Sequence, residues 1–273
     1  DLQKLYAEGV IDPEFGVKDA VKVSENVNAG KVGMFYGYFW NCSSGWLQDG
    51  KMNDPSIDWI AVPILSIDDE PAKAMVPFAT TYYTVVSKDC ANPEAAVKMY
   101  NLVLEKMFGE TAQPEVYNST PENLAVFNYA YSYGEPPMKN LDAQQAVVAA
   151  LESGDASGLS AEQKNYYDNC VAYEESGDLA LWGNYMMYGP DGGLGVINEY
   201  VSSGNVVTDN YFGAPTDGMA EKNATLQKLQ LETFTKIITG SADIDEFDTY
   251  VENWKSLGGQ QITDEVNEWL AQR

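Results

Sequence analysis

Residues 30–40, GKVGMFYGYFW, constrain the fold of this chain more than any other segment. Alternate side chains along the segment fall into two sets, which is the pattern of a β-strand with two different faces. Because glycine weakens a strand, the glycines within it indicate that another backbone or a ligand comes close there. One face carries Val32, Met34, Tyr36 and Tyr38, and the other carries Gly33, Phe35, Gly37 and Phe39.

Three aromatic residues, Tyr38, Phe39 and Trp40, end this predicted strand. Open α/β sheets bind ligands at the carboxyl ends of their strands. Aromatic rings at that edge offer flat apolar faces with polar rims, which suit a ligand that alternates C–H faces with hydroxyl groups, namely a sugar. The alternative is that the same rings pack in the core, as large aromatic side chains often do.

The composition supports a folded chain with an acidic surface. Hydrophobic residues make up 45% of the 273 residues, which suffices for one large domain or two smaller ones. The formal net charge is −25. Such a charge repels phosphate groups and anionic lipids, so we expect no nucleic-acid partner and no direct binding to a membrane surface.

The chain has no histidine, which excludes Ser-His-Asp and Cys-His nucleophilic catalysis. Its three cysteines, Cys42, Cys90 and Cys170, lie far apart in the sequence and form no zinc-binding pattern. We therefore expect no catalytic residues, no metal site and no cofactor. A single disulfide among the three cysteines stays open at this point.

The chain begins inside a helical pattern formed by Leu2, Leu5, Tyr6 and Val10. It shows no signal peptide, and no run of it approaches the ~20 apolar residues of a membrane-spanning helix. A helix without a preceding cap is typical of a piece of a longer protein, so we expect further sequence before Asp1.

Periodicity and capping residues predict a helix-rich chain with a few strands. β-Branched and aromatic residues predict two further strands, at 58–63 and 82–87. Residues 109–145 predict irregular structure with short helices, and the glycine-, proline- and aromatic-rich stretch 182–218 predicts loops, which commonly carry function. Helices are predicted over 1–10, 18–29, 92–108, 140–151, 160–175, 220–239, 243–257 and from 263 onward.

Three blocks of sequence carry a resemblance to a known family. The first is the segment 30–40, with its Gly-Lys-x-x-Met start and aromatic end; the second is the strand–helix unit 83–100; the third is 236–269. In order and spacing they resemble the extracellular solute-binding proteins of ABC importers, family 1, the sugar-binding group that includes maltose-binding protein. The resemblance covers most of the chain except about 109–180. Residues 212–216 are similar to the larger lipoprotein branch, whose members are near twice this length.

The resemblance implies an α/β fold of the periplasmic-binding-protein-like type II, with two lobes and a ligand in the cleft between them. This chain would be the helix-rich C-terminal half, without most of the N-lobe. Residues 1–72 would form a C-lobe segment, 73–135 a return segment in the N-lobe, and 136–273 a C-lobe segment with additional helices.

The expected ligand-binding residues combine this resemblance with the residue types themselves. Trp40 matches the aromatic that stacks on sugar in the family, and Tyr38 and Asn41 flank it. Core packing is the alternative for Trp40, and a helix N-cap is the alternative for Asp217. The full set of expected ligand-binding residues is Tyr38, Trp40, Asn41, Thr81, Tyr82, Trp182, Tyr185 and Asp217.

The family implies a non-enzymatic protein that binds an extracellular mono- or oligosaccharide and delivers it to the permease subunits of an ABC importer. The whole protein would be a monomeric, extracellular or periplasmic lipoprotein of the cell surface, held to the membrane through an N-terminal lipid anchor outside this chain. Two alternatives stay open. A glycan-interaction module is one. A glycoside hydrolase is the other, although no pair of carboxylates stands beside the aromatic strand.

Overall fold

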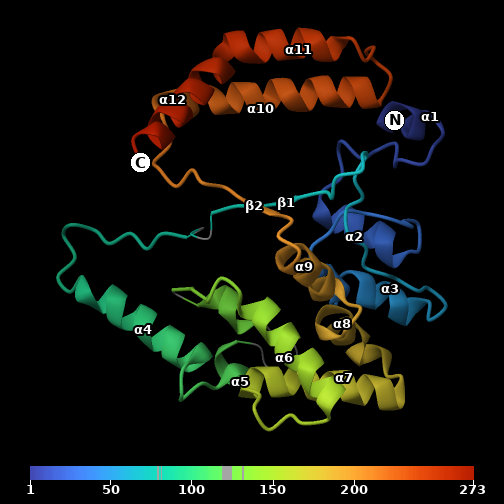
Figure 1. The fold of residues 1–273 in the computed structure, drawn as a ribbon, viewed down its shortest axis with the longest axis vertical. Coiled ribbons are helices and arrows are strands. Elements are labelled where there is room, and N and C mark those ends of the chain that lie inside the picture. The colour runs from blue at the N-terminus through green and yellow to red at the C-terminus, as the bar shows by residue number, and fades with distance from the viewer. Residues whose placement is uncertain (79, 81, 119–124, 131) are drawn as a thin grey trace. The chain divides into compact units, whose positions relative to one another are not determined.

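A computed structural model describes residues 1–78, 80, 82–118, 125–130 and 132–273 of the protein (Figure 1). The chain divides into two compact units, one made of residues 1–23 and 209–273 and the other of residues 24–208. The boundaries expected at 72/73 and 135/136 both fall inside the second unit. The assignment of these segments to lobes of a larger fold stays a prediction.

The first unit consists of four helices. They are α1 (Leu2–Ala7), α10 (Asp217–Ile238), α11 (Glu246–Trp254) and α12 (Gln260–Ala271), and the other three pack against α10. The helices predicted at 1–10, 220–239, 243–257 and from 263 onward are confirmed, with shifted ends. α10 begins three residues before the predicted start because the hydroxyl of Thr216 accepts a hydrogen bond from the Met219 N–H at 3.2 Å.

A glycine makes the bend between α11 and α12. Gly258 lies in the π-helical turn η3 (Lys255–Gly259) and has φ +129°, a conformation that side chains oppose. A Cβ atom at this position would also lie 2.7 Å from Cγ of Lys222 on α10. The predicted stop at Gly258 is therefore a sharp bend that lets α12 continue along α10.

The second unit contains most of the remaining helices and a very small sheet. α2 (Ala20–Asn28) spans the boundary after Val23, so its first turn belongs to the first unit and the rest to the second. It is followed by η1 (Phe39–Cys42), α3 (Leu47–Asn53), β1 (Ala74–Val76), α4 (Glu94–Phe108), α5 (Pro114–Tyr117), η2 (Val126–Tyr129), α6 (Lys139–Ser153), α7 (Ala161–Ser176), α8 (Leu179–Tyr188), α9 (Gly193–Ser202) and β2 (Val206–Thr208). The helices predicted at 18–29, 92–108, 140–151 and 160–175 are confirmed as α2, α4, α6 and α7.

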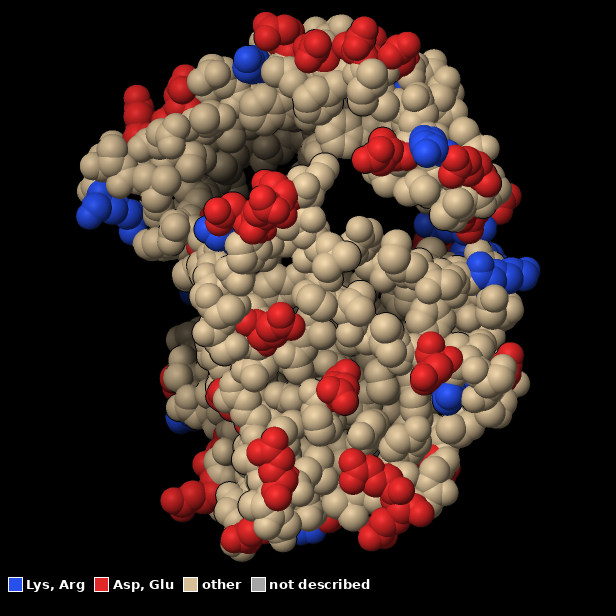
Figure 2. Space-filling model, turned by 45° about the vertical axis from the view of Figure 1, so that its right-hand side comes forward, with Lys and Arg blue, Asp and Glu red and all other residues tan. Residues whose placement is uncertain are grey.

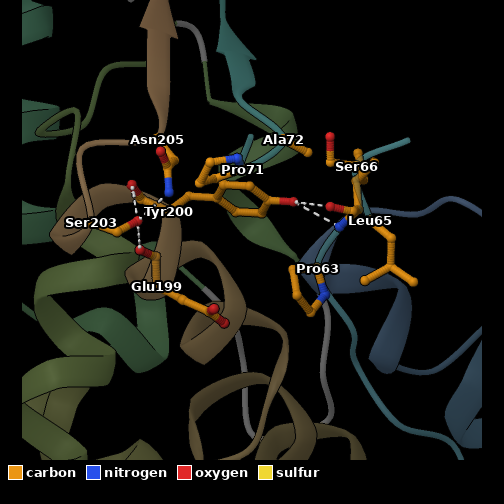
Figure 3. Close-up of a pocket in the computed structure, with 10 residues that line it drawn as sticks. Pro63, Leu65, Ser66, Pro71, Ala72, Glu199, Tyr200, Ser203 and Asn205 are labelled. Atoms are coloured by element: carbon orange, nitrogen blue, oxygen red, sulfur yellow. Dashed lines mark hydrogen bonds between the residues drawn. The ribbon is translucent and has the colours of Figure 1, made fainter. Parts of the chain in front are cut away.

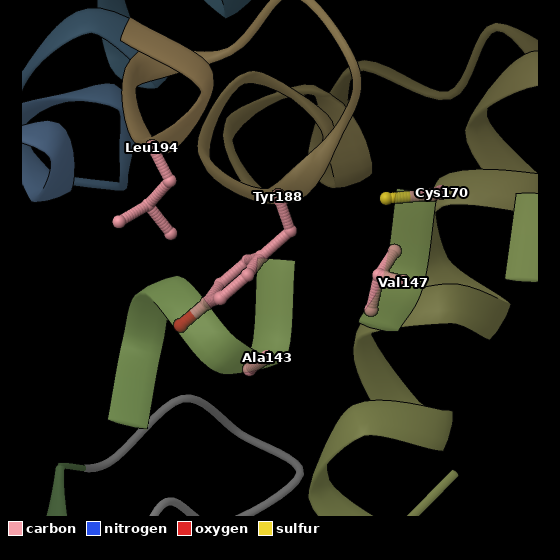
Figure 4. Packing of buried hydrophobic residues seen from close by; sticks show 5 residues of the cluster. All are labelled: Ala143, Val147, Cys170, Tyr188 and Leu194. Carbon is pink, nitrogen blue, oxygen red and sulfur yellow. The ribbon is translucent and has the colours of Figure 1, made fainter. Parts of the chain in front are cut away.

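The core of the second unit lies where α6, α7, α8 and α9 meet (Figure 4). Ala143 and Val147 come from adjacent turns of α6, because residues four apart share one face of a helix. They pack with Cys170 of α7, Tyr188 of α8 and Leu194 of α9, all of which are at most 4% exposed. This cluster fixes the frame on which the candidate site stands.

Residues 182–218 form helices for much of their length, which corrects the expectation of loops. The carboxylate of Asp178 accepts a hydrogen bond from the Ala180 N–H at 2.9 Å and so starts α8. Trp182 is then buried to 2% exposure, and Tyr188 to 4%. The aromatic residues suggested a binding loop, but tertiary burial of one helical face decided the structure.

The three predicted strands at 30–40, 58–63 and 82–87 are not formed among the described residues. A strand exists only where its backbone groups find a partner, and the sequence pattern does not show the partner. The described part of the chain instead pairs β1 with β2 in parallel, with Ala74 opposite Val206 and Val76 opposite Thr208. Each strand has three residues, so the α/β fold class stays a prediction.

Candidate functional site

The segment 38–43 closes into a tight turn in place of the predicted strand end. The side-chain Oδ1 of Asn41 accepts the Tyr38 N–H at 2.6 Å. The Trp40 carbonyl accepts both the N–H of Ser43, at 3.0 Å, and its hydroxyl, at 2.7 Å. These local bonds use the backbone groups that a sheet would otherwise pair. Asn41 is 6% exposed, so its side chain holds the turn from the buried side.

The turn presents two stacked aromatic rings to solvent. The rings of Tyr38 and Trp40 have their centroids 4.3 Å apart and their planes 10° apart. Tyr38 is 68% exposed and Trp40 is 48% exposed. Phe39 stands nearly perpendicular to Trp40, with centroids 5.2 Å apart. Exposed stacked rings are unusual unless something covers them, because large apolar surface is costly in water.

The base of this aromatic pair is held in place because three helices, α3, α8 and α9, pack against η1. Phe39 packs against the core cluster of α6 to α9. A Cβ atom at Gly193 of α9 would lie 3.2 Å from Cα of Phe39, and one at Gly183 of α8 would lie 2.6 Å from the Cys42 carbonyl oxygen. Glycines at these two positions therefore allow the close approach of η1 to both helices.

The other expected residues of the second unit lie apart from this turn or beneath the surface. Trp182 lies in the core at 2% exposure, so no face of its indole is open to a ligand. Tyr185 is half-buried and packs on Tyr173 with centroids 4.9 Å apart; burial, and then the Glu174 carboxylate, raise its pKa. Tyr82 is 75% exposed and meets the edge of Tyr133 at 6.2 Å.

Thr81 lies outside the described residues. Asp217 is the first residue of α10 and belongs to the first unit. The N-cap of α10 is Thr216 and not Asp217, so the alternative role considered for Asp217 belongs to its neighbour. The Asp217 carboxylate is exposed in the first turn of the helix, where the helix dipole favours a negative charge.

A hollow of about 210 Å³ lies between the segment 63–72 and the end of α9. Figure 3 shows Tyr200 reaching across it toward the backbone of the opposite wall. The Tyr200 oxygen accepts the Ile64 N–H at 2.7 Å, and its hydroxyl faces the Ile64 carbonyl at 3.4 Å. This tyrosine therefore fastens the segment to α9 and uses its polar group within the protein.

A second hollow, of about 520 Å³, lies between α4 and residues 135–136. Tyr100 and Phe108 supply aromatic walls, and Glu105 and Glu135 supply two carboxylates. Sequence reasoning missed this hollow, because it treated residues 109–145 as irregular structure and did not place Glu135 beside α4. The sequence feature that could have indicated it is the presence of aromatic rings and carboxylates on α4 and at residues 135–136.

On the face drawn in Figure 2, acidic side chains are spread between broad uncharged areas. Within the described ranges, no three His, Cys, Asp or Glu side chains are placed together to hold a metal ion. All three cysteines are free thiols. No helix in the described part of the chain is both long and apolar enough to span a membrane.

Comparison with known proteins gives two relatives and no family assignment. No family model matches the chain, and no solved structure matches it. The chain is 26% identical over 274 residues to the "Uncharacterized protein in butB 5'region" of Niallia circulans, which covers 98% of this chain and 96% of that protein.

The chain is also 24% identical over 276 residues to the lipoprotein LipO of Bacillus subtilis strain 168. This match covers 97% of the chain but 49% of LipO. The chain therefore spans about half the length of that relative, and its similarity to a bacterial lipoprotein extends over nearly all of its own length.

Proposed function

We propose that this chain binds a mono- or oligosaccharide outside the cell, without turnover, through the ring face of Trp40 on the turn that also carries Tyr38. One observation carries the proposal: two exposed rings lie parallel at 4.3 Å on a turn held by Asn41 and the core. The apolar C–H face of a sugar ring fits on such a surface, while its hydroxyl groups stay in contact with water and nearby polar groups.

The proposal extends to the protein of which this chain would form part. LipO carries the name lipoprotein and is about twice as long as the matched region. We propose a LipO-like, lipid-anchored protein of the cell surface, with the two-lobed periplasmic-binding-protein-like fold, that delivers its sugar to the permease of an ABC importer. The exposed apolar side chains of segment 60–64 support the proposal that this segment pairs with a strand of the larger protein. Ile60 is 76% exposed, Val62 62% and Ile64 57%.

The hollow beside α4 favours a glycoside hydrolase as a second candidate, because Glu105 and Glu135 line it together with two aromatic rings. Glycoside hydrolysis requires one carboxylic acid that keeps its proton. Hydrogen bonds from the Thr111 side chain and backbone lower the pKa of Glu105. Glu135 forms an ion pair with Lys139 at 3.9 Å. Glu105 therefore lacks the surroundings of a general acid, so binding without hydrolysis is the better-supported function.

A thermal-shift screen of the 273-residue chain against mono- and oligosaccharides tests the proposal. A ligand at a concentration of ~100 Kd stabilises a protein by about 2.7 kcal/mol, which is readily measured. We expect at least one neutral sugar to raise the unfolding temperature. Trp40→Ala should weaken its binding by about tenfold, the effect of losing a stacking contact. Tyr129→Ala is the matched control, since this tyrosine is 78% exposed and lies away from η1.

Three results would contradict parts of the proposal. If no sugar shifts the unfolding temperature, carbohydrate binding by this chain is wrong. Equal weakening by Trp40→Ala and Tyr129→Ala would move the site away from η1. Release of a shortened sugar, detected by chromatography and abolished by Glu105→Gln, would support the hydrolase and overturn the non-enzymatic function.

A further inference from the structure

The stacked pair has a consequence for how a sugar reaches Trp40. A sugar stacks on a whole aromatic face, and the Tyr38 ring covers one face of the indole at 4.3 Å and 10°. The phenol ring thus occupies the position that a sugar ring would take. The site as it stands is filled by the protein itself.

The backbone and the side chain of Tyr38 are held very differently. Its N–H donates to Asn41 Oδ1 at 2.6 Å, so the backbone is fixed to the turn. Its ring is 68% exposed and stacks on Trp40. Rotation about χ1 would break this stack, and exposed side chains change rotamer readily.

The ring of Phe39, which lies between Tyr38 and Trp40 in the sequence, cannot move in this way. Phe39 packs against the core cluster, and its Cα lies close to Gly193 of α9. Of the two rings in contact with Trp40, only that of Tyr38 can leave without disturbing the core. The covered face next to Tyr38 is thus the one that can open.

We propose that Tyr38 is a gate that covers the ligand face of Trp40 in the free protein and swings away when a sugar binds. This inference rests on the proposed function of the same site. When one aromatic stack closes the gate, roughly one molecule in six is in the open form. The apparent Kd is then weakened about sixfold relative to an open site.

A measurement on the ligand-free protein tests the gate. Acrylamide quenching of tryptophan fluorescence, compared between each protein and its Trp40→Phe form, isolates the signal of Trp40. Tyr38→Ala should raise the quenching constant of Trp40 about twofold, whereas Tyr38→Phe should leave it unchanged because the stack remains. Tyr36→Ala is the matched control: Tyr36 is 83% exposed on the same segment. An unchanged constant in Tyr38→Ala would overturn the gate.

Stopped-flow kinetics with a sugar found in the screen give the second test. Tyr38→Ala should increase the association rate constant about sixfold, and Tyr38→Phe and Tyr36→Ala should not. Binding with an unchanged association rate in Tyr38→Ala would overturn the gate and leave the proposed function intact. If neither the parent nor Tyr38→Ala binds any sugar, the proposed function fails and the gate fails with it.

Discussion

Tyr166 and Tyr188 lie face to face, with ring centroids 3.8 Å apart and planes 13° apart. The pair joins α7 to α8 at the edge of the main core cluster. The Tyr166 hydroxyl donates to the Glu162 carboxylate at 2.9 Å, and the Tyr188 hydroxyl donates to Asn140 Oδ1 at 3.4 Å. Because η1 rests on α8, this pair also supports the candidate site.

Removal of the Tyr188 ring should strongly destabilise the second unit. Tyr188 is 4% exposed, so Tyr188→Ala leaves a cavity and should lower the free energy of unfolding by about 3–5 kcal/mol. Tyr188→Phe keeps the ring, removes its hydroxyl with the long hydrogen bond to Asn140, and should cost about 1 kcal/mol. Urea unfolding followed by circular dichroism measures both values. Equal losses in the two variants would contradict a packing role for the ring.

Alkaline pH should destabilise the protein through the same tyrosines. Burial raises the pKa of both Tyr166 and Tyr188 above the ordinary 10.0. Above pH 10 the unfolded chain therefore loses these protons before the folded protein does, and the free energy of unfolding falls as pH rises. The stabilising contribution is fully present below about pH 10.

Tyr166→Phe isolates one of these groups. It should reduce the alkaline slope of the unfolding free energy by about 1 kcal/mol per pH unit between pH 10 and 11. Urea unfolding at a series of pH values measures the slope. Tyr129→Phe, at an exposed tyrosine, is the control for loss of a phenol hydroxyl. An identical slope in Tyr166→Phe and the parent would show that Tyr166 is not protected from ionisation.

Glu162 ties three parts of the second unit together. Its carboxylate accepts hydrogen bonds from Tyr166 and from Asn118 Nδ2, the latter at 2.8 Å, and pairs with Lys139 at 2.9 Å. The side chains of Glu162 and Lys139 are only 14% and 13% exposed. Glu162→Gln leaves the Lys139 ammonium poorly compensated and should cost about 2 kcal/mol of stability.

The exposed Glu152 on α6 provides the control for this substitution. Glu152→Gln should change the free energy of unfolding by less than about 0.5 kcal/mol, as surface substitutions usually do. Chemical denaturation of both variants gives the comparison. Matching values would mean that the Glu162 pair contributes no more than a surface charge.

The three thiols should react at very different rates. Cys90 is exposed, whereas Cys42 and Cys170 are buried and burial raises their pKa to about 11 and about 12. Because the thiolate is the reactive form, iodoacetamide at pH 8 should modify Cys90 alone in the folded protein. Mass spectrometry should show one added group before unfolding and three after it. Cys90→Ser should abolish the reaction of the folded protein, and rapid labelling of Cys42 would contradict its burial.

Helices were easier to predict from the sequence than strands, because a helix start depends on residues close together in the sequence. The Ser160–Gln163 capping box starts α7 as predicted, with the Ser160 N–H bonded to the Gln163 side chain at 2.9 Å. A cap of this kind depends on residues three positions apart. The parallel pair of Ala74 with Val206 depends on segments far apart in sequence, so no local sequence pattern predicted it.

The candidate site shows the same division. Aromatic composition was sufficient to select Tyr38 and Trp40 as a ring surface, and the structure leaves both rings exposed. The same reasoning selected Trp182, which lies in the core because its neighbours on α8 share a buried helical face. Residue type alone did not distinguish the two tryptophans.

The sequence by itself determined the acidic surface, the absence of histidine chemistry and the positions of most helices, because each depends on composition or on contacts within a few residues. Only the tertiary structure decided that η1 packs against α8 and α9, that Trp182 is buried and that β1 meets β2. Those outcomes follow from packing and hydrogen bonding between distant segments, where the free energy of burial outweighs local preference.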